Sequence, residues 1–134
     1  MSRLCLDTSA YSNFRRAAPE VVSLLDAASW VGVPAIVLGE LRTGFRLGRA
    51  PDDNELALHR FLANPAVAIV EVDDEAASIY ADIVVALREA GTPVPTNDIW
   101  IAATAVRERA TVVTYDRHFS QIRRAGVRIL EAGR

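Results

Sequence analysis

The sequence contains no lysine, because all fifteen residues counted as lysine or arginine are arginine. Walker-type phosphate loops, Schiff-base enzymes and receiver-type phosphorylation pockets each rely on a lysine ammonium group that arginine does not readily replace. Cysteine is scarce too. The single Cys5 cannot form a disulfide within the chain, and with only His59 and His118 it leaves too few soft ligands for a structural zinc site. These absences exclude several classes of site and predict that Cys5 is a small buried hydrophobe.

Long apolar runs are also missing. Runs such as residues 31–39 span less than half of the ~20 residues that a membrane helix needs, and Asp7 interrupts any signal-like start. We therefore expect a cytoplasmic protein with no membrane partner. The net charge of -2 excludes the broad positive field of an architectural nucleic-acid-binding protein. Any contact with nucleic acid must then be local.

What the chain does have is the composition of a globular protein, with 51% hydrophobic and 24% charged residues. Its 134 residues suit one domain, and no internal repeat or long linker divides them. We expect a single domain over residues 1–134.

Short apolar runs alternate with stretches of helical periodicity along this domain. The runs predict five strands, at residues 4–6, 30–33, 66–72, 111–114 and 127–130. Helical periodicity predicts six helices. The first begins at Pro19, the second covers residues 35–47 and the third follows a turn at residues 49–54. The fourth runs from Asp73 or Asp74 to Gly91, the fifth begins at Asn97 and a short sixth follows Asp116. This alternation predicts an α/β fold of three layers, with a parallel sheet of roughly five strands between helices.

Four acidic residues occupy unusual positions in this predicted fold. Ligands of parallel sheets bind beyond the carboxyl ends of the strands, and Asp7 and Asp116 follow the first and fourth predicted strands. Glu40 shares a helix face with apolar residues, where a carboxylate is rare. Asp98 lies in the first turn of a helix whose inner face is rich in alanine. We expect these four side chains to meet in one cleft.

Crowded carboxylates raise each other's proton affinity unless a cation neutralises them. Hard oxygen ligands without histidine or thiolate favour Mg²⁺ or Mn²⁺ over zinc. Each aspartate also has a purely structural explanation: Asp7 as a helix cap, Asp98 as a charge that favours a helix start, and Asp116 as a turn residue. Their joint placement with Glu40 is what indicates a metal site.

The stretches that carry these acids resemble the PIN-domain ribonucleases in order and spacing. They are Asp7-Thr8-Ser9 after the first strand, Gly39-Glu40-Leu41 within a helix, the segment Asn97-Asp98-Ile99-Trp100-Ile101-Ala102-Ala103 and the segment Thr114-Tyr115-Asp116-Arg117-His118-Phe119. As a set, these motifs are similar to those of VapC-type toxins, the nuclease half of a type II toxin–antitoxin (VapBC) pair. The likeness spans the whole chain.

This resemblance implies a hydrolase, a metal-dependent endoribonuclease that cleaves RNA with a water activated by one or two Mg²⁺ or Mn²⁺ ions. Carried over by position, the catalytic and metal-binding pocket consists of Asp7, Glu40, Asp98 and Asp116. The foremost direct ligands would be Asp7 and Asp98, and Ser9 and Thr114 would support the site.

The same resemblance implies partners. It implies a homodimer and inhibition by a cognate VapB-like antitoxin, whose basic tail we expect to enter the pocket. RNA phosphates would be contacted by arginine, since lysine is missing. Arg117 is the candidate nearest in sequence to one of the acids.

Three alternatives remain on the sequence alone. One is a stand-alone PIN nuclease in RNA processing. Another is a phosphatase like the haloacid dehalogenases, which needs a second aspartate where this chain has Ser9. The third is a binding module whose acid cluster receives an arginine from a partner protein. A test for catalytic activity separates this binding module from a nuclease.

Overall fold

A computed structural model describes residues 2–132 and contains a parallel sheet in the strand order β3-β2-β1-β4-β5. The strands are β1 (Arg3–Leu6), β2 (Trp30–Pro34), β3 (Val67–Val70), β4 (Thr111–Thr114) and β5 (Val127–Ile129). The central strand β1 pairs with β2 on one side and with β4 on the other. The chain first builds outward to β3 and then crosses to β4 and β5. The crevice beyond the carboxyl ends of β1 and β4 is therefore a topological switch point, where open α/β sheets bind ligands.

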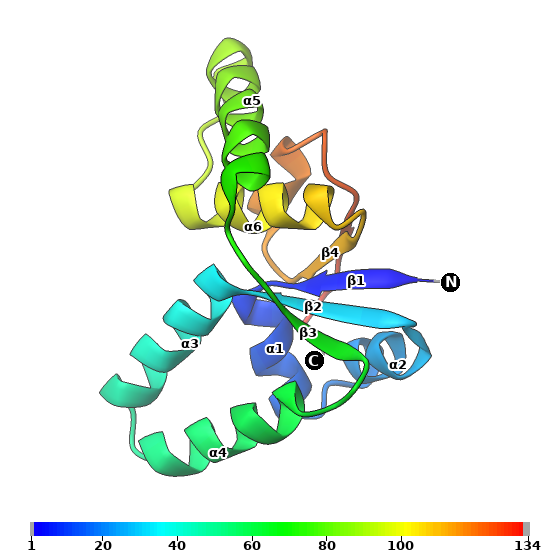
Figure 1. Cartoon of the computed structure of the whole chain (residues 1–134), viewed down its shortest axis with the longest axis vertical. Helices are drawn as coiled ribbons and strands as arrows, with labels where there is room; N and C mark the ends of the chain where they lie inside the picture. Colours follow the sequence, from blue (N-terminus) through cyan, green and yellow to red (C-terminus); the bar gives the residue numbers. More distant parts are fainter. Residues whose placement is uncertain (1, 133–134) are drawn as a thin grey trace.

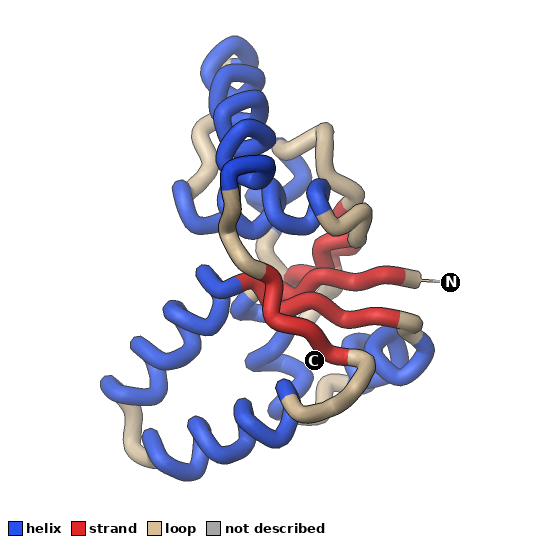
Figure 2. The backbone as a smooth tube through the Cα atoms, viewed as in Figure 1, coloured by secondary structure: helices blue, strands red, loops and turns tan. Residues whose placement is uncertain are grey.

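Helices cover both faces of this sheet. They are α1 (Thr8–Arg15), α2 (Pro19–Ala27), α3 (Ala35–Leu47), α4 (Pro51–Leu62), α5 (Asp74–Ala90), α6 (Thr96–Arg107) and the short 3₁₀ helix η1 (Arg117–Gln121). Helices α5 and α6 lie on one face and α1 to α4 on the other (Figure 1), and the strands form the layer between them (Figure 2). The predicted three-layer α/β fold with a five-stranded parallel sheet is confirmed. No helix within residues 2–132 has both the length and the hydropathy to cross a bilayer.

The core lies along the three inner strands β2, β1 and β4, because both of their faces are covered. Leu6 and Val112 are fully buried, and the small side chains of Ala102 and Ala103 on α6 let this helix pack closely on the sheet. Cys5 is also fully buried, as predicted, and its burial raises the pKa of its thiol to about 12. The core thus fixes β1 and β4, the two strands whose ends carry Asp7 and Asp116.

Helix α1 was not predicted from the sequence. Its residues are mostly polar, and only Ala10 and Tyr11 are buried, so helical periodicity is weak over its 8 residues. The helix forms because Asp7 caps its first turn. This cap brings α1 directly to the end of β1.

The turn predicted at residues 49–54 is wrong from residue 51 onward. Pro51 is the first residue of α4, a position that suits the fixed φ of proline. Asp52 and Asp53 lie in the first turn of that helix, where their charges interact favourably with its dipole. Residues typical of turns therefore also start helices, and composition alone does not separate the two cases.

Candidate active site

Asp7 lies at the junction of β1 and α1. Its Oδ1 accepts hydrogen bonds of 2.8 Å from the backbone N–H of Ala10 and from the Ser9 hydroxyl. Its Oδ2 accepts a hydrogen bond of 2.5 Å from the Thr114 hydroxyl. Only 4% of Asp7 is exposed, and this burial raises the pKa of its carboxyl group, while the hydrogen bonds that it accepts act in the opposite direction. The side chain is therefore fixed at the carboxyl end of the central strand.

Two hydroxyl groups connect the ends of β1 and β4. Thr114 is fully buried, and its hydroxyl accepts a hydrogen bond of 2.8 Å from the backbone N–H of Asp116. The Ser9 hydroxyl accepts a hydrogen bond of 3.0 Å from the backbone N–H of Tyr115. Each hydroxyl thus accepts an N–H from the segment after β4 and donates its own proton to Asp7. Both lie beside the acids as the sequence predicts, and their supporting role stays a prediction.

Glu40 reaches the same crevice from α3. Its Oε1 accepts a hydrogen bond of 2.6 Å from the Thr8 hydroxyl, and its Oε2 accepts one of 3.4 Å from the side-chain amide of Asn97. The residue is half-buried. These two donors, one at the start of α1 and one at the start of α6, explain how a carboxylate is accommodated on an otherwise apolar helix face.

Asp98 is the third residue of α6 and is half-buried. Its burial and the negative charges of the other three acids raise the pKa of its carboxyl group to about 6. Among these charges, that of Asp116 has the largest effect, followed by those of Asp7 and Glu40. The structure thus brings the four acids from β1, α3, α6 and the end of β4 into one electrostatic environment.

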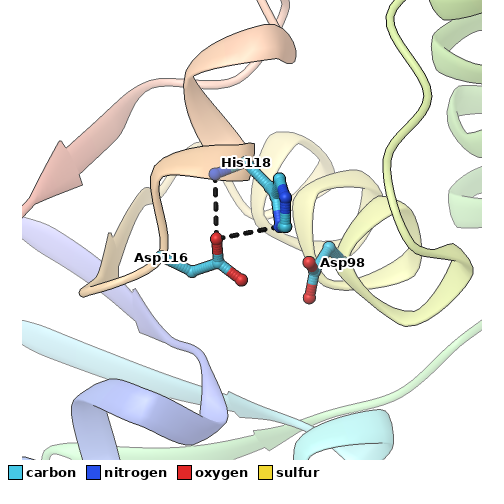
Figure 3. A group of neighbouring side chains, drawn as sticks. All are labelled: Asp98, Asp116 and His118. Carbon is cyan, nitrogen blue, oxygen red and sulfur yellow. Dashed lines mark hydrogen bonds and ion pairs between the residues drawn. The ribbon is translucent and has the colours of Figure 1, made fainter.

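Asp116 caps η1 and holds His118 close to the acids. Its Oδ1 accepts a hydrogen bond of 2.9 Å from the backbone N–H of His118 and lies 3.0 Å from Nδ1 of the same histidine. Asp98, Asp116 and His118 each place one possible ligand atom within 4.8 Å of the others. Figure 3 shows the three side chains together: Asp98 comes from α6, His118 from η1 and Asp116 from the turn before η1. Their spacing is compatible with a single bound cation.

No arginine pairs with these four acids in the part of the chain that the structure describes. The other ion pairs within residues 2–132 join arginines or His59 to other carboxylates, and His118 is the only basic partner of the four acids there. Four carboxyl groups with so little compensating charge, one of them with its pKa raised to about 6, favour the binding of positive charge. The oxygen-rich donor set therefore fits a hard divalent cation such as Mg²⁺ or Mn²⁺.

Three of the residues predicted for the site lie outside the group formed by Asp98, Asp116 and His118: they are Asp7, Glu40 and Arg117. Asp7 and Glu40 are outside the compact group of possible ligands, so the prediction of Asp7 as a foremost direct ligand stays a prediction. The side chain of Arg117 is 81% exposed and lies 3.6 Å from the carboxylate of Glu131. Its contact with RNA phosphates likewise stays a prediction.

Three residues that lie beside the acids have no role predicted from the sequence: His118, Thr8 and Asn97. The short helix predicted after Asp116 is present as η1, but the position of the His118 ring depends on its 3₁₀ geometry and on the cap by Asp116, which the sequence pattern does not reveal. Thr8 and Asn97 are each adjacent to one of the acids in the sequence. That adjacency was the available signal, because polar neighbours of a cluster often orient it.

Removing the Thr114 hydroxyl is expected to destabilise the protein. Thr114→Val keeps the shape of the side chain but leaves Oδ2 of Asp7 and the N–H of Asp116 without this partner. We expect the free energy of unfolding to fall by about 2 kcal/mol in urea denaturation, because one of the lost bonds involves a buried carboxyl group. Thr104→Val is the matched control, since Thr104 is equally buried and its hydroxyl donates to a carbonyl of its own helix rather than to a carboxyl group. Equal losses in the two variants would contradict the special role of Thr114.

Both the sequence and the fold of this chain are similar to those of known proteins. Residues 4–125 match the family described as PIN domain. Ribonuclease VapC4 of Mycobacterium tuberculosis is 33% identical over 89 residues, which cover 66% of this chain and 68% of that protein.

Solved structures agree with the sequence comparison. A member of the VapBC family of toxin-antitoxin systems, VapBC-5 from Mycobacterium tuberculosis, has a TM-score of 0.75 and 30% identity, with 98% of this chain and 100% of that chain covered. VapBC2 from Rickettsia felis, bound to a DNA fragment from their promoter, has a TM-score of 0.85 and 22% identity, with coverage of 96% and 98%. At this identity, the second likeness shows the fold.

Proposed function

This chain belongs to the PIN domain family, and within it to the VapC-type ribonucleases, and from that membership we propose that it is the metal-dependent endoribonuclease toxin of a toxin–antitoxin pair. The observation that carries the proposal is the convergence of Asp7, Glu40, Asp98 and Asp116 at the switch point of the sheet, with no arginine to neutralise them among residues 2–132. A site of this charge suits a cation and, through it, a phosphodiester.

In this proposal, Asp98 and Asp116 hold the cation, and the other acids complete the negative pocket. A bound divalent ion would lower the pKa of a water molecule and stabilise negative charge on the leaving oxygen. Thr114 and Ser9 orient the Asp7 carboxyl group through hydrogen bonds of 2.5 and 2.8 Å. No side-chain nucleophile is needed.

Glu40 is positioned differently from Asp7. It accepts hydrogen bonds from Thr8 and Asn97, which lie next to Asp7 and Asp98 in the sequence. These bonds connect α3 to the starts of α1 and α6. We propose that Thr8 and Asn97 are positioning residues that hold the Glu40 carboxylate beside the other acids.

The test of this function is cleavage of total cellular RNA by the purified protein with Mg²⁺ or Mn²⁺, followed by mapping of the new ends. We expect a limited set of internal cleavage sites, because an endonuclease cuts within chains. RNA that stays intact across a range of both ions would refute the ribonuclease assignment. Release of single nucleotides from chain ends would instead refute the endonuclease part of the proposal.

We also propose that a cognate antitoxin inhibits this chain, since the similar structure from Mycobacterium tuberculosis is described as a member of the VapBC family of toxin-antitoxin systems. A basic tail of that antitoxin would find four carboxyl groups in the crevice. We expect the product of the neighbouring gene to bind the protein and suppress RNA cleavage in a co-purification and activity assay. A neighbour that neither binds nor inhibits would favour a stand-alone nuclease.

Other parts of the proposal follow from the family. They are a single PIN domain over residues 1–134, a homodimer in solution and a place in the cytoplasm. Sedimentation analysis of the purified protein would test the dimer, and a monomer at micromolar concentration would contradict it. A phosphatase like the haloacid dehalogenases is not favoured, because Ser9 occupies the position of its second aspartate and is hydrogen-bonded to Asp7.

A further inference from the structure

The imidazole of His118 lies among the acids of the crevice. One possible ligand atom from this residue is within 4.8 Å of those from Asp98 and Asp116. The backbone N–H of His118 donates to Oδ1 of Asp116, so the turn that carries the ring is anchored by one of the acids. The ring thus approaches the site from η1, opposite the Asp98 side chain on α6 (Figure 3).

The distance between Nδ1 of His118 and Oδ1 of Asp116 is 3.0 Å. This distance suits a hydrogen bond between the two side chains in the metal-free protein. Neighbouring ligands on an octahedral cation with bonds of about 2.1 Å are also separated by about 3.0 Å. The same pair of atoms therefore fits both states with little movement of the backbone.

The other histidine of the chain has different surroundings. Nε2 of His59 lies 3.0 Å from Oε2 of Glu55, and Arg42 also pairs with this carboxylate. The charge of Glu55 is thus balanced by arginine, whereas Asp98 and Asp116 have no arginine partner among residues 2–132. His118 alone of the two histidines faces carboxyl groups that are available to a cation.

We propose that His118 supplies a nitrogen ligand to the cation held by Asp98 and Asp116, and that this ligand makes the site bind Mn²⁺ in preference to Mg²⁺. Mg²⁺ takes oxygen ligands and keeps several waters, whereas first-row transition ions gain more from an imidazole nitrogen. The inference rests on the proposed metal-dependent function. It adds a residue that the four-acid pocket does not include, and it assigns that residue to metal selectivity.

The first test compares metal affinities of the wild type and His118→Asn at one pH and ionic strength. Titration with Mn²⁺ is followed by electron paramagnetic resonance of the free ion, and Mg²⁺ is measured by competition. We expect the dissociation constant for Mn²⁺ to rise about tenfold and that for Mg²⁺ to change less than about twofold. The asparagine amide can still donate to Asp116. An unchanged ratio of the two constants would therefore overturn the role in selectivity.

The second test looks for the nitrogen ligand itself. Pulsed electron paramagnetic resonance detects the hyperfine coupling of bound Mn²⁺ to a coordinated imidazole nitrogen, in protein prepared without a histidine tag. The chain has only two histidines, so His59→Asn is the matched control. We expect the coupling in the wild type and in His59→Asn, and its loss in His118→Asn.

The outcomes separate this inference from the proposed function. Wild-type protein that binds Mn²⁺ without nitrogen coupling would overturn the role of His118 and leave the four-acid metal site standing. Protein that binds neither ion would overturn both. The side chain of His118 is 61% exposed, so its replacement should not impair folding, and the wild-type spectrum is decisive even without the variant.

Discussion

Asp98→Asn is expected to reduce RNA cleavage by about a thousandfold and at the same time to make the metal-free protein more stable. Activity falls because the variant loses a carboxylate that holds the cation. Without a firmly held cation, the negative charge that develops in the transition state is no longer stabilised. Cleavage rates of a defined RNA at saturating Mg²⁺ measure this effect. Wild-type rates in the variant would remove Asp98 from the catalytic pocket.

The gain in stability follows from the raised pKa. In the folded protein, the Asp98 carboxyl group has a pKa of about 6, above its ordinary value of 3.8. The free energy of unfolding therefore falls as the pH rises from about 3.8 to about 6, and it stays lower at neutral pH. A neutral asparagine removes the burial and repulsion of that charge. We expect a gain of about 1 kcal/mol at pH 7.5 in EDTA, allowing for solvent screening of a half-buried group.

Asp53→Asn is the matched control for both effects. Asp53 is the third residue of α4, as Asp98 is of α6, but it is exposed. Its replacement should leave cleavage unchanged and lower the stability by about 0.5 kcal/mol, because a helix dipole favours negative charge in the first turn. Urea denaturation of the three proteins in EDTA measures the comparison. A loss of stability in Asp98→Asn as large as that in Asp53→Asn would contradict repulsion among the acids.

Removal of divalent metal is expected to abolish cleavage, and added Mg²⁺ or Mn²⁺ is expected to restore it and to stabilise the fold. A ligand at about 100 times its dissociation constant adds about 2.7 kcal/mol to the free energy of unfolding. For a domain of this size, that corresponds to a rise on the order of 8 °C in melting temperature. Scanning calorimetry with EDTA and with each ion measures the shift. Cleavage that persists in excess EDTA would refute metal dependence.

The stabilisation by metal should depend on pH in a defined direction. A cation competes with the proton on Asp98, whose pKa in the metal-free protein is about 6. We therefore expect the metal-induced rise in melting temperature to be full at pH 7.5, to decrease as the pH falls through 6, and to be small at pH 5. In Asp98→Asn, the rise should be small at all three pH values. A shift that is equally large at pH 5 would place the cation away from Asp98.

Much of the site was predictable because it follows from topology. Asp7 comes directly after β1 and Asp116 comes two residues after β4, and since these strands are adjacent and parallel, their carboxyl ends meet. Glu40 stood out as an acid on an apolar helix face. These inferences need only the order of elements and the direction of strands, and both can be read from hydrophobic patterns.

The contacts between side chains were not predictable. The bonds from Thr8 to Glu40 and from Thr114 to Asp7 join residues 32 and 107 positions apart, and their geometry depends on how α1, α3 and β4 pack. A short helix after Asp116 was predicted, but the position of the His118 ring depends on its 3₁₀ geometry and on the cap by Asp116, which periodicity does not specify. The helix α1 was missed for a related reason, because its start depends on the cap by Asp7 more than on apolar spacing.

The connection between Asp7 and Thr114 has a consequence for the synthesis of the protein. The Thr114 hydroxyl that orients Asp7 belongs to β4, and Asp116 follows two residues later. A nascent chain that ends after α6 therefore already carries three of the acids but lacks both Thr114 and Asp116. A translation product that ends before β4 therefore has no assembled pocket. The four acids can come together only after the ribosome has added Asp116, so the potential for cleavage arises late in the synthesis of this domain.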